Sequence, residues 1–314
     1  MRMEIKNKYM PEGHLISTES NRLYTSSLKN LEIAMRRGLI LEGIACICDC
    51  TDMSLKVKLG NFEGKIEHSE TMYCDGEIKD IAVISRVGKP VCFKVVSIDT
   101  KNGEPLIRLS RREAQKECTE NFISHLKAGD IIPSVVTHLD PFGAFVDIGC
   151  GIISLITIDC ISVSRIFHPS DRLFVGQRLH TVVKCRDGET GRIYMSLREL
   201  LGTWEENAAA FTPYSTVPGI VRSVEDYGVF VELSPNLAGL AELREDVMPG
   251  DACSVYIKNI IPERMKIKLV IIDITGESTR EPLKYFVDVG KVHHMDSWYY
   301  SPLGAKKRVE TVFG

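Results

Sequence analysis

Short apolar segments, each ended by glycine or by polar residues, fill the middle of the chain. They cover residues 131–139, 142–149, 151–156, 175–187 and 191–197. Runs of this length, rich in valine and isoleucine and separated by turn residues, are typical of β-strands. Five such strands within so short a stretch predict a small closed barrel.

The same succession of segments returns nearer the C-terminus. There the segments cover residues 218–224, 227–233, 238–243, 249–260 and 265–272. The connection between the second and fourth segments is shorter than in the middle copy. We therefore expect one wall of this third barrel to be thin, or to be filled by another part of the chain.

A weaker copy precedes both of these. Its segments cover residues 42–50, 53–60, 64–70, 87–99 and 104–110. Gly88 and Asp99 have the same separation in sequence as Gly176 and Asp187. An equal spacing inside the same order of segments supports a true internal repeat.

Segments rich in helix formers and free of internal proline connect the copies. They cover residues 18–37, 110–126 and 197–211, which predict a leader helix and two spacers. Trp204 is expected to pack a linker helix against a barrel. The predicted parts are a leader at 1–38, a degenerate barrel at 39–110, a linker at 111–126, a barrel at 127–198, a linker at 199–213, a shortened barrel at 214–275 and an aromatic, basic extension at 276–314.

The second segment of the middle copy carries two aromatic residues. Side chains alternate between the faces of a strand, so Phe145 shares a face with Asp147. Because a carboxylate is rarely buried, we expect both to point to water. Phe142 has the opposite parity, but Gly143 permits a bulge that brings it onto the same face. The third copy repeats this order with Tyr227, Gly228, Phe230 and Glu232.

Exposed aromatic pairs of this kind suit single-stranded RNA. A base stacked on such a ring contributes about 1–3 kcal/mol with little sequence preference, and single strands can splay their bases outward. The alternative is that the rings belong to ordinary core, but the repetition favours the RNA surface. Cations that could follow the phosphates are Arg165, Arg172, Lys184, Arg186, Arg192, Arg222, Lys258, Lys266 and Lys268.

The sequences FGAFVDIG, VGQ, VKCRD and GRIYMSLREL of the middle copy resemble the S1 RNA-binding domain, a five-stranded OB-fold best known from ribosomal protein S1. The resemblance extends over residues 39–275. It implies a mainly β protein, built from tandem S1-type barrels joined by helical linkers. In that family the RNA-facing surface has two aromatics on strand two, a histidine on strand three, and an aspartate and an arginine on strands four and five.

Carried onto the middle copy, these roles fall on Phe142, Phe145, Ser154 in place of histidine, Asp187 and Arg192. In the third copy they fall on Tyr227, Phe230, Glu242, Ile261 and Lys266. The first copy has Met53, Lys56, Glu67 and Leu106 at the aromatic, aromatic, histidine and arginine positions, and keeps only Asp99. We expect it to have lost base stacking and to act as an adaptor. Lys184 and Lys258 are expected to contact RNA, and His168 either contacts RNA or caps a turn before Pro169.

Composition limits the possible partners and the location. The formal net charge of the 314 residues is −3, so an RNA site must rest on a local face. No apolar run reaches the roughly 18 residues of a membrane span, and the N-terminus lacks the apolar core of a secretory signal. The ten cysteines are spread along the chain. We expect reduced thiols, a cytoplasmic location and no membrane partner.

Other chemistry finds little support in the sequence. Cys46, Cys48 and Cys50 share one face of a strand and are expected to be core thiols rather than metal ligands. Adjacent His293 and His294 would point in opposite directions on a strand. There is no Walker loop, nucleophile elbow or HExxH motif, and we expect no cofactor, no metal and no enzymatic activity. A nuclease is the least favoured hypothesis.

Two functions remain open at this point. The first is non-enzymatic binding of single-stranded RNA or mRNA in translation, in association with the small ribosomal subunit. The second is a protein-interaction adaptor built from degenerate OB-folds with little RNA affinity. The aromatic and basic C-terminal extension either enlarges an RNA surface or covers the shortened third barrel.

Overall fold

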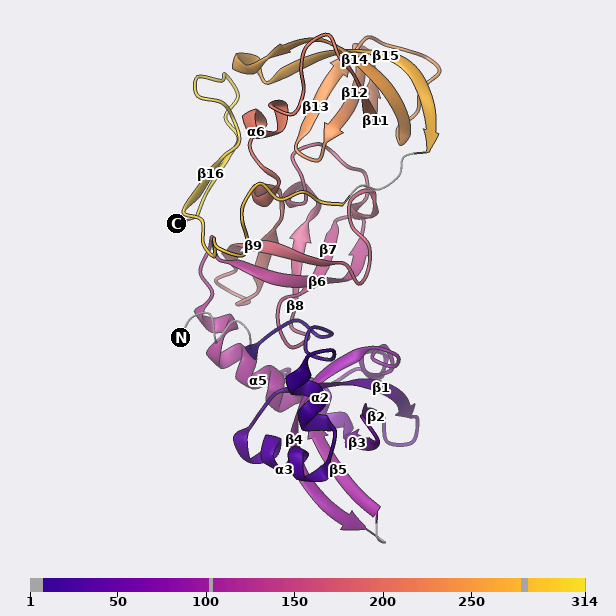
Figure 1. Ribbon diagram of the computed structural model, residues 1–314, viewed down its shortest axis with the longest axis vertical. Helices are drawn as coiled ribbons and strands as arrows, with labels where there is room; N and C mark the ends of the chain where they lie inside the picture. Colours follow the sequence, from indigo (N-terminus) through magenta and orange to yellow (C-terminus); the bar gives the residue numbers. More distant parts are fainter. Residues whose placement is uncertain (1–7, 102–103, 278–281, 314) are drawn as a thin grey trace. The chain divides into compact units, whose positions relative to one another are not determined.

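Three closed barrels of five strands make up most of the computed structural model, which describes residues 8–101, 104–277 and 282–313 (Figure 1). The first contains, in spatial order, β1 (Leu41–Asp49), β2 (Ser54–Leu59), β3 (Phe62–Ile66), β5 (Glu104–Ser110) and β4 (Pro90–Lys101). The middle barrel contains β10 (Ile193–Ser196), β8 (Ile153–Thr157), β7 (Gly143–Asp147), β6 (Ile131–Asp140) and β9 (Arg178–Arg186). The third contains β11 (Thr216–Glu225), β12 (Gly228–Ser234), β13 (Leu237–Ala241), β15 (Lys266–Glu277) and β14 (Asp251–Ile261).

Each barrel is closed by one parallel pair between its third and fifth strands. The pairs are β3 with β5, β8 with β10, and β13 with β15. This order of strands is that of the OB-fold, and the predicted mainly β class is confirmed. The third barrel is closed like the others, so the expected thin wall is not found. The alternative, that another part of the chain fills this barrel, agrees with the packing of Trp298 and Tyr300 in its core. Its shorter connection removes residues between β13 and β14 and leaves the strands complete.

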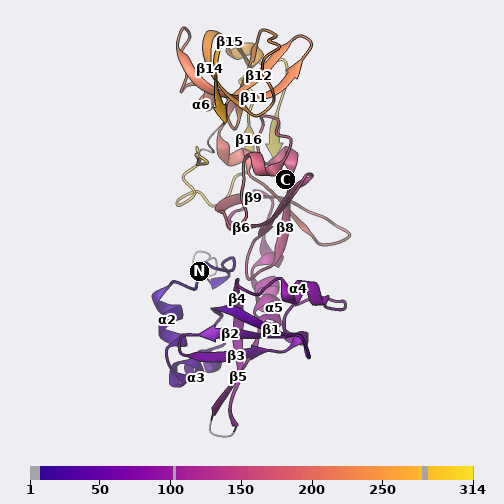
Figure 2. The same ribbon diagram turned by 90° about the vertical axis from the view of Figure 1, so that its right-hand side faces the viewer.

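Alternating side chains build each core. In β2, Leu55, Val57 and Leu59 are fully buried while Lys58 is exposed. The antiparallel strands thus show the period of two that a half-buried strand requires. β4 and β5 continue beyond the first barrel as a two-stranded extension (Figure 2).

The chain divides into two compact units. The first contains residues up to Leu126 with Pro133–Val135 and Asp147–Ile153, and the second contains Lys127–Ile132, Val136–Val146 and the chain from Ser154 onward. The first unit holds the first barrel. The second unit holds most of the middle barrel, the whole third barrel and the C-terminal segment.

The helices of the first unit begin at polar caps. The expected leader helix is two helices, α2 (Glu19–Thr25) and α3 (Leu28–Arg37), because Ser27 accepts a hydrogen bond from the backbone of Asn30 and starts a new helix. Ser110 caps α5 (Arg111–Asn121) in the same way, as such residues commonly do. The shorter helices here are η1 (His68–Glu70), α4 (Asp80–Ile84) and η2 (Ile123–His125).

Asp147 is buried, although its position on the strand predicted exposure. Its carboxylate accepts hydrogen bonds from the backbone N–H groups of Glu12 (2.7 Å), Gly149 (2.8 Å) and Gly151 (3.0 Å). Burial and the charge of Glu12 raise the pKa of Asp147 to about 7. Arg111, also buried, binds Glu12 at 2.6 Å. The expectation for Asp147 failed because backbone donors replace water around it.

The connection between the middle and third barrels is packed rather than free. It contains η5 (Arg198–Leu201) and α6 (Trp204–Ala208), and Trp204 lies in the core cluster of the third barrel, as expected. Leu200 and Leu201 are also buried. A spacer between independent barrels would leave such side chains in water, so this connection joins the two barrels.

Glu232 holds the same two barrels together. It is the counterpart of Asp147 on the second strand of the third barrel, and it too is buried rather than exposed as expected. Its carboxylate binds Arg172 at 2.6 Å and Arg222 at 2.8 Å. Arg172 comes from the connection between β8 and β9, which also contains η3 (Ile158–Cys160) and η4 (Pro169–Asp171). Two arginines thus compensate the buried charge.

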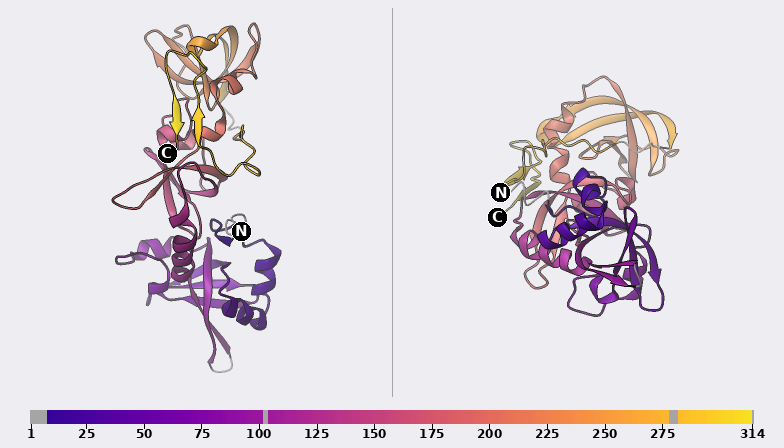
Figure 3. Two further views of the ribbon diagram at one scale, coloured as in Figure 1. Left: turned by 90° about the vertical axis from the view of Figure 1, so that its left-hand side faces the viewer. Right: turned by 60° about the horizontal axis from the view of Figure 1, so that its bottom comes forward.

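The C-terminal segment covers both barrels of the second unit. β16 (Ser297–Tyr299) and β17 (Glu310–Val312) pair as an antiparallel hairpin (Figure 3). Trp298 and Tyr300 enter the core cluster of the third barrel, whereas Tyr285 packs against buried residues of the middle barrel. The remaining short element is η6 (Pro262–Arg264). In the described part of the chain, no helix has the length and apolarity needed to cross a membrane.

Candidate nucleic-acid interface

The aromatic pair of the middle barrel lies on its outer surface. Phe142, in the turn before β7, is 55% exposed, and Phe145 in β7 is half-buried. Their ring centroids are 5.8 Å apart with an interplanar angle of 88°. The exposed part of the Phe142 ring is open to contact with a further ring.

The third barrel repeats this geometry. Tyr227 is 69% exposed, and its ring meets that of Phe230 at 6.1 Å and 88°. The placement of the two aromatics on one outer surface was predicted for both copies. Two barrels that differ in most other side chains therefore keep the same aromatic pair in the same arrangement.

The glycine between the aromatics acts differently from what the sequence suggested. Phe142 and Tyr227 lie in the turn before the strand, so strand parity does not apply to them. The bulge lies in the preceding strand, at Arg222 in the third barrel. A Cβ on Gly143 would lie 2.3 Å from the carbonyl oxygen of Ile156. The glycine is thus required for the close approach of β7 and β8.

Gly143→Ala should lower the free energy of unfolding by about 1–3 kcal/mol, the usual cost of forcing an extra group into a packed site. Chemical denaturation of the full chain measures the change. Gly188→Ala is the matched control, because a Cβ at Gly188 in the same barrel meets nothing within 4 Å. Equal stabilities of the two variants would show that the close approach at Gly143 carries no strain.

His138 is a third ring that sequence reasoning missed. It lies on β6, is exposed, and stacks on Phe145 with centroids 6.0 Å apart and an interplanar angle of 30°. Asp140 lies 3.3 Å from its Nε2. The sequence could have predicted this contact, because the short turn after Asp140 places His138 opposite Phe145. Ser223 pairs with Phe230 in the same way in the third barrel. We call Phe142, Phe145 and His138 the aromatic platform.

Ser154 does not reach this surface. It is buried, and its hydroxyl donates a hydrogen bond to the carbonyl of Ile193. In the parallel pairs that close the barrels, Leu155 faces Tyr194 as Leu240 faces Lys268.

This register makes Ser154 the counterpart of Gly239, and it makes Thr157 the counterpart of Glu242. The histidine position therefore falls on Thr157, and its assignment to Ser154 was wrong by three residues. Thr157 is half-buried beside Gly143. A Cβ added to Gly143 would lie 3.1 Å from the Cα of Thr157.

The two predicted lysines on the fourth strands, Lys184 and Lys258, both have side-chain partners. Lys184 donates a hydrogen bond to the sulfur of Cys160 at 2.9 Å. Burial lowers the pKa of Lys184, but the contact with Cys160 and the charge of Asp159 raise it overall. Lys258, at the same place in the third barrel, binds Glu242 at 2.8 Å, which holds the pKa of Glu242 below its usual range.

Asp187 organises the turn between β9 and β10. Its carboxylate accepts hydrogen bonds from the backbone of Glu189 (3.0 Å) and Thr190 (2.7 Å), which lower its pKa. Arg192 ends this turn and is exposed. Lys266 is exposed at the same place, opposite Ile261 in the third barrel. Asp187 thus positions the turn that presents Arg192.

His168 caps a turn, the alternative to an RNA contact that the sequence left open. Its ring accepts a hydrogen bond from the backbone N–H of Ser170 at 3.1 Å, and Asp171 completes the capping box. The ring is only half-exposed. This role explains the histidine before Pro169 without a ligand.

The first barrel lacks an aromatic pair. Met53 and Lys56 occupy its places, and Lys56 forms an ion pair with Glu63 at 3.3 Å. At the place of His138 it has Ile47, which is 50% exposed. Leu106 is half-buried, and Glu67 and Asp99 are exposed, so no stacking surface replaces the missing rings at these positions.

The remaining candidates form no site in the described residues. Cys46 and Cys50 are exposed and Cys48 is half-buried, so the prediction of three core thiols was wrong. The bulge in β1 after Ala45 disturbs the alternation that the prediction assumed. His294 binds Asp130 at 2.9 Å. Within residues 8–101, 104–277 and 282–313, no group of three or more potential ligands is arranged to hold a metal ion.

Comparison with known proteins supports the class that the fold and the platform define. Residues 125–198 match the family model of the S1 RNA binding domain. The middle barrel is thus an S1 RNA-binding domain, and the resemblance seen in the sequence is confirmed there.

Curated relatives extend the similarity beyond the middle barrel. The chain is 27% identical over 226 residues to small ribosomal subunit protein bS1 of Rhodopseudomonas palustris, covering 67% of this chain and 39% of that protein. It is 32% identical over 214 residues to the bS1 protein of Rickettsia typhi, covering 66% of this chain and 36% of that protein. The match therefore spans well under half the length of these relatives.

Among solved structures, one similar chain is a multidomain protein with nucleic acid binding domains from Streptococcus pneumoniae. It shares 16% identity and a TM-score of 0.25, over 75% of this chain and 74% of that one. A TM-score this low bears on neither fold nor function.

Proposed function

We propose that the protein binds single-stranded RNA without catalysis, through the outer faces of its middle and third barrels. The observation that carries the proposal is the repeated aromatic pair, Phe142 with Phe145 and Tyr227 with Phe230, in one edge-to-face geometry. A base that stacks on such an exposed ring contributes about 1–3 kcal/mol, with little dependence on which base it is. The middle barrel is the main contact because His138 enlarges its platform.

Basic side chains beside the aromatics support an RNA ligand. Arg192 and Lys266 take equivalent exposed places at the start of the fifth strand of each barrel. Each can neutralise a phosphate while bases stack on the rings. Lys184 and Lys258 can contribute only by exchanging their present partners, Cys160 and Glu242, for phosphate.

A role in translation, with mRNA as the RNA and the small ribosomal subunit as a partner, is part of the same proposal. It is supported by the S1 RNA binding domain match and by the similarity to small ribosomal subunit proteins bS1. The relatives are much longer than the matched region, so a ribosomal partner for this chain is a hypothesis.

A second function is proposed for the first barrel, as an adaptor to another protein. Its stacking positions are lost, whereas Ile47, Ile81 and Ile84 are exposed by 50%, 68% and 43%. Exposed apolar side chains favour protein contacts over a phosphate backbone.

A fluorescence anisotropy titration with a pyrimidine-rich single-stranded RNA tests the main proposal. We expect binding at low salt and a linear fall of log affinity with log salt, because phosphate contacts release counterions. Two salt concentrations with the full chain are sufficient. No binding at low salt would contradict RNA binding and leave the adaptor role as the better explanation.

A further inference from the structure

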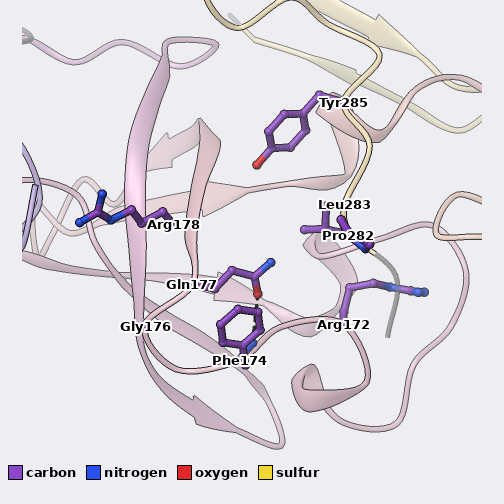
Figure 4. A pocket seen from close by; sticks show the side chains of 8 residues that line it. All are labelled: Arg172, Phe174, Gly176, Gln177, Arg178, Pro282, Leu283 and Tyr285. Atoms are coloured by element: carbon purple, nitrogen blue, oxygen red, sulfur yellow. Dashed lines mark hydrogen bonds between the residues drawn. The ribbon is translucent and has the colours of Figure 1, made fainter. Parts of the chain in front are cut away.

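A pocket of about 460 Å³ lies in the second unit, apart from the aromatic platform (Figure 4). One side comes from the turn before β9 and the other from the C-terminal segment. Its lining includes Phe174, Gln177, Arg178, Pro282, Leu283 and Tyr285. Its size suits a ligand of the dimensions of a nucleotide.

The turn at Phe174–Gln177 points a hydrogen-bond donor into this space. The side-chain oxygen of Gln177 accepts a hydrogen bond from the backbone N–H of Phe174 at 3.0 Å. Its amide nitrogen is therefore directed the other way, toward the space below Tyr285 (Figure 4). Because the oxygen is fixed, this amide offers the pocket N–H donors only.

Tyr285 supplies a second donor from the opposite side. Its hydroxyl oxygen accepts a hydrogen bond from the backbone N–H of His180 at 2.9 Å. Its own proton is then available to a ligand. Phe174, which is 51% exposed, and Leu283 add apolar walls. The pocket therefore fits a flat group that carries hydrogen-bond acceptors.

Two arginines contribute to the lining of the pocket. Arg178 is exposed at its rim, and its guanidinium extends away from Gln177 and Tyr285 (Figure 4). Arg172 also contributes to the wall, but its guanidinium is bound by Glu232 and extends away from Gln177 (Figure 4). A ligand that combines acceptors with negative charge is favoured at such a place.

The backbone connects the pocket to the aromatic platform. Val136 of β6 donates to the carbonyl of Gln177 at 3.0 Å and accepts from the N–H of Gly176 at 2.7 Å. His138 of the platform follows two residues later, or about 7 Å along the strand. A strand of RNA that stacks on the platform can therefore place a neighbouring nucleotide at the pocket.

The third barrel has the same turn with different chemistry. There Asp251 accepts from the backbone N–H of Met248 at 2.8 Å, and Gly250 donates to Val221 at 2.8 Å. Asp251 takes the place of Gln177 and Met248 that of Phe174. A carboxylate offers no N–H donor and repels phosphate, so the donor arrangement is specific to the middle barrel.

We propose that this pocket binds one nucleotide of the RNA whose neighbours stack on the aromatic platform, with preference for a base rich in carbonyl oxygens, such as uracil. This inference rests on the proposed RNA-binding function. The amide of Gln177 and the hydroxyl of Tyr285 donate to the base, and Phe174 covers its face, while Arg178 at the rim faces the phosphates that lie outside the pocket. The pocket extends the binding site beyond the platform.

Gln177→Glu tests the proposal with little change in shape. The new carboxylate keeps an acceptor for the backbone of Phe174 but loses the donor and adds repulsion. We expect about fivefold weaker binding, or more, to oligouridylate of roughly twelve nucleotides. A dinucleotide, which is too short to stack on the platform and enter the pocket at the same time, should bind the variant and the native chain equally. Phe174→Ala should behave similarly, and Phe167→Ala is its matched control, because Phe167 is 61% exposed on the same connection outside the pocket lining.

The outcomes separate this proposal from the one it rests on. If the native chain binds neither oligonucleotide, RNA binding itself fails. If the native chain binds both and Gln177→Glu matches it on the longer RNA, the pocket is not a nucleotide site. If Phe167→Ala weakens binding as much as Phe174→Ala, or Gln177→Glu weakens both RNAs alike, a general surface effect replaces the pocket.

Discussion

Replacing Phe142 and Phe145 together with alanine should weaken the binding of single-stranded RNA about tenfold or more. Each stacked base contributes about 1–3 kcal/mol, and this variant removes both stacking rings while leaving His138 without its neighbour. Fluorescence anisotropy with a pyrimidine-rich RNA measures the loss. The fold should persist, because Phe142 is 55% exposed and Phe145 is half-buried.

Two controls give this experiment its meaning. Phe167→Ala removes an exposed ring outside the platform and should leave affinity unchanged. Tyr227→Ala with Phe230→Ala should cause a smaller loss than the middle-barrel pair, since the third barrel has no counterpart of His138. Native affinity in a double variant with an unchanged circular dichroism spectrum would remove the platform from the RNA site.

Glu232→Gln should lower the free energy of unfolding of the second unit by about 3–5 kcal/mol, because it leaves two buried arginines without their shared counter-charge. Arg172 and Arg222 are 6% and 8% exposed, so water cannot replace the carboxylate. Urea denaturation, followed by tryptophan fluorescence from Trp204 and Trp298, reports on this unit. Glu263→Gln, an exposed change in the same barrel, is the matched control.

The same carboxylate gives stability a pH dependence. Burial raises the pKa of Glu232, but the hydrogen bonds and charges of Arg172 and Arg222 outweigh it and lower the pKa overall. A group of this kind stabilises the fold above its unfolded pKa, near 4.3, and the stabilisation is lost as pH falls through the lower folded pKa. Below about pH 4.3 the native chain should therefore lose stability more steeply than Glu232→Gln. If the free energies of unfolding of the native chain and Glu232→Gln fell equally as the pH is lowered, Glu232 would contribute no charge-dependent stability.

The barrels and their aromatic pairs could be predicted from sequence because both follow local rules. The period of two, the turn residues and the repetition define the strands. The repeated sequence pattern around Phe142 and Tyr227 predicts that these rings lie on the outer surface of their barrels. Even the mistaken role of Gly143 led to the right placement, since both a bulge and a turn release Phe142 from strand parity.

The failures came from partners distant in sequence. Asp147 and Glu232 occupy positions that alternate outward in a strand, and only the fold shows the donors that surround them. Arg172 lies 60 residues before Glu232, with nothing in the sequence to pair the two. Ser154 was misplaced because the register of the third strand is set by the pairing of β8 with β10, which the sequence does not show.

The packed connection between the middle and third barrels affects which lengths of RNA can contact both barrels at once. Barrels on flexible tethers gain avidity over a broad range of ligand lengths, set by effective concentration. Barrels fixed by Trp204 and by Glu232 with its two arginines cannot reorient to suit the ligand. The gain in affinity from engaging both barrels then depends on how many nucleotides separate the two unpaired stretches of RNA that they bind. The spacing of unpaired stretches in the RNA then becomes a property that this pair of barrels selects, in addition to the base preference proposed for the pocket of the middle barrel.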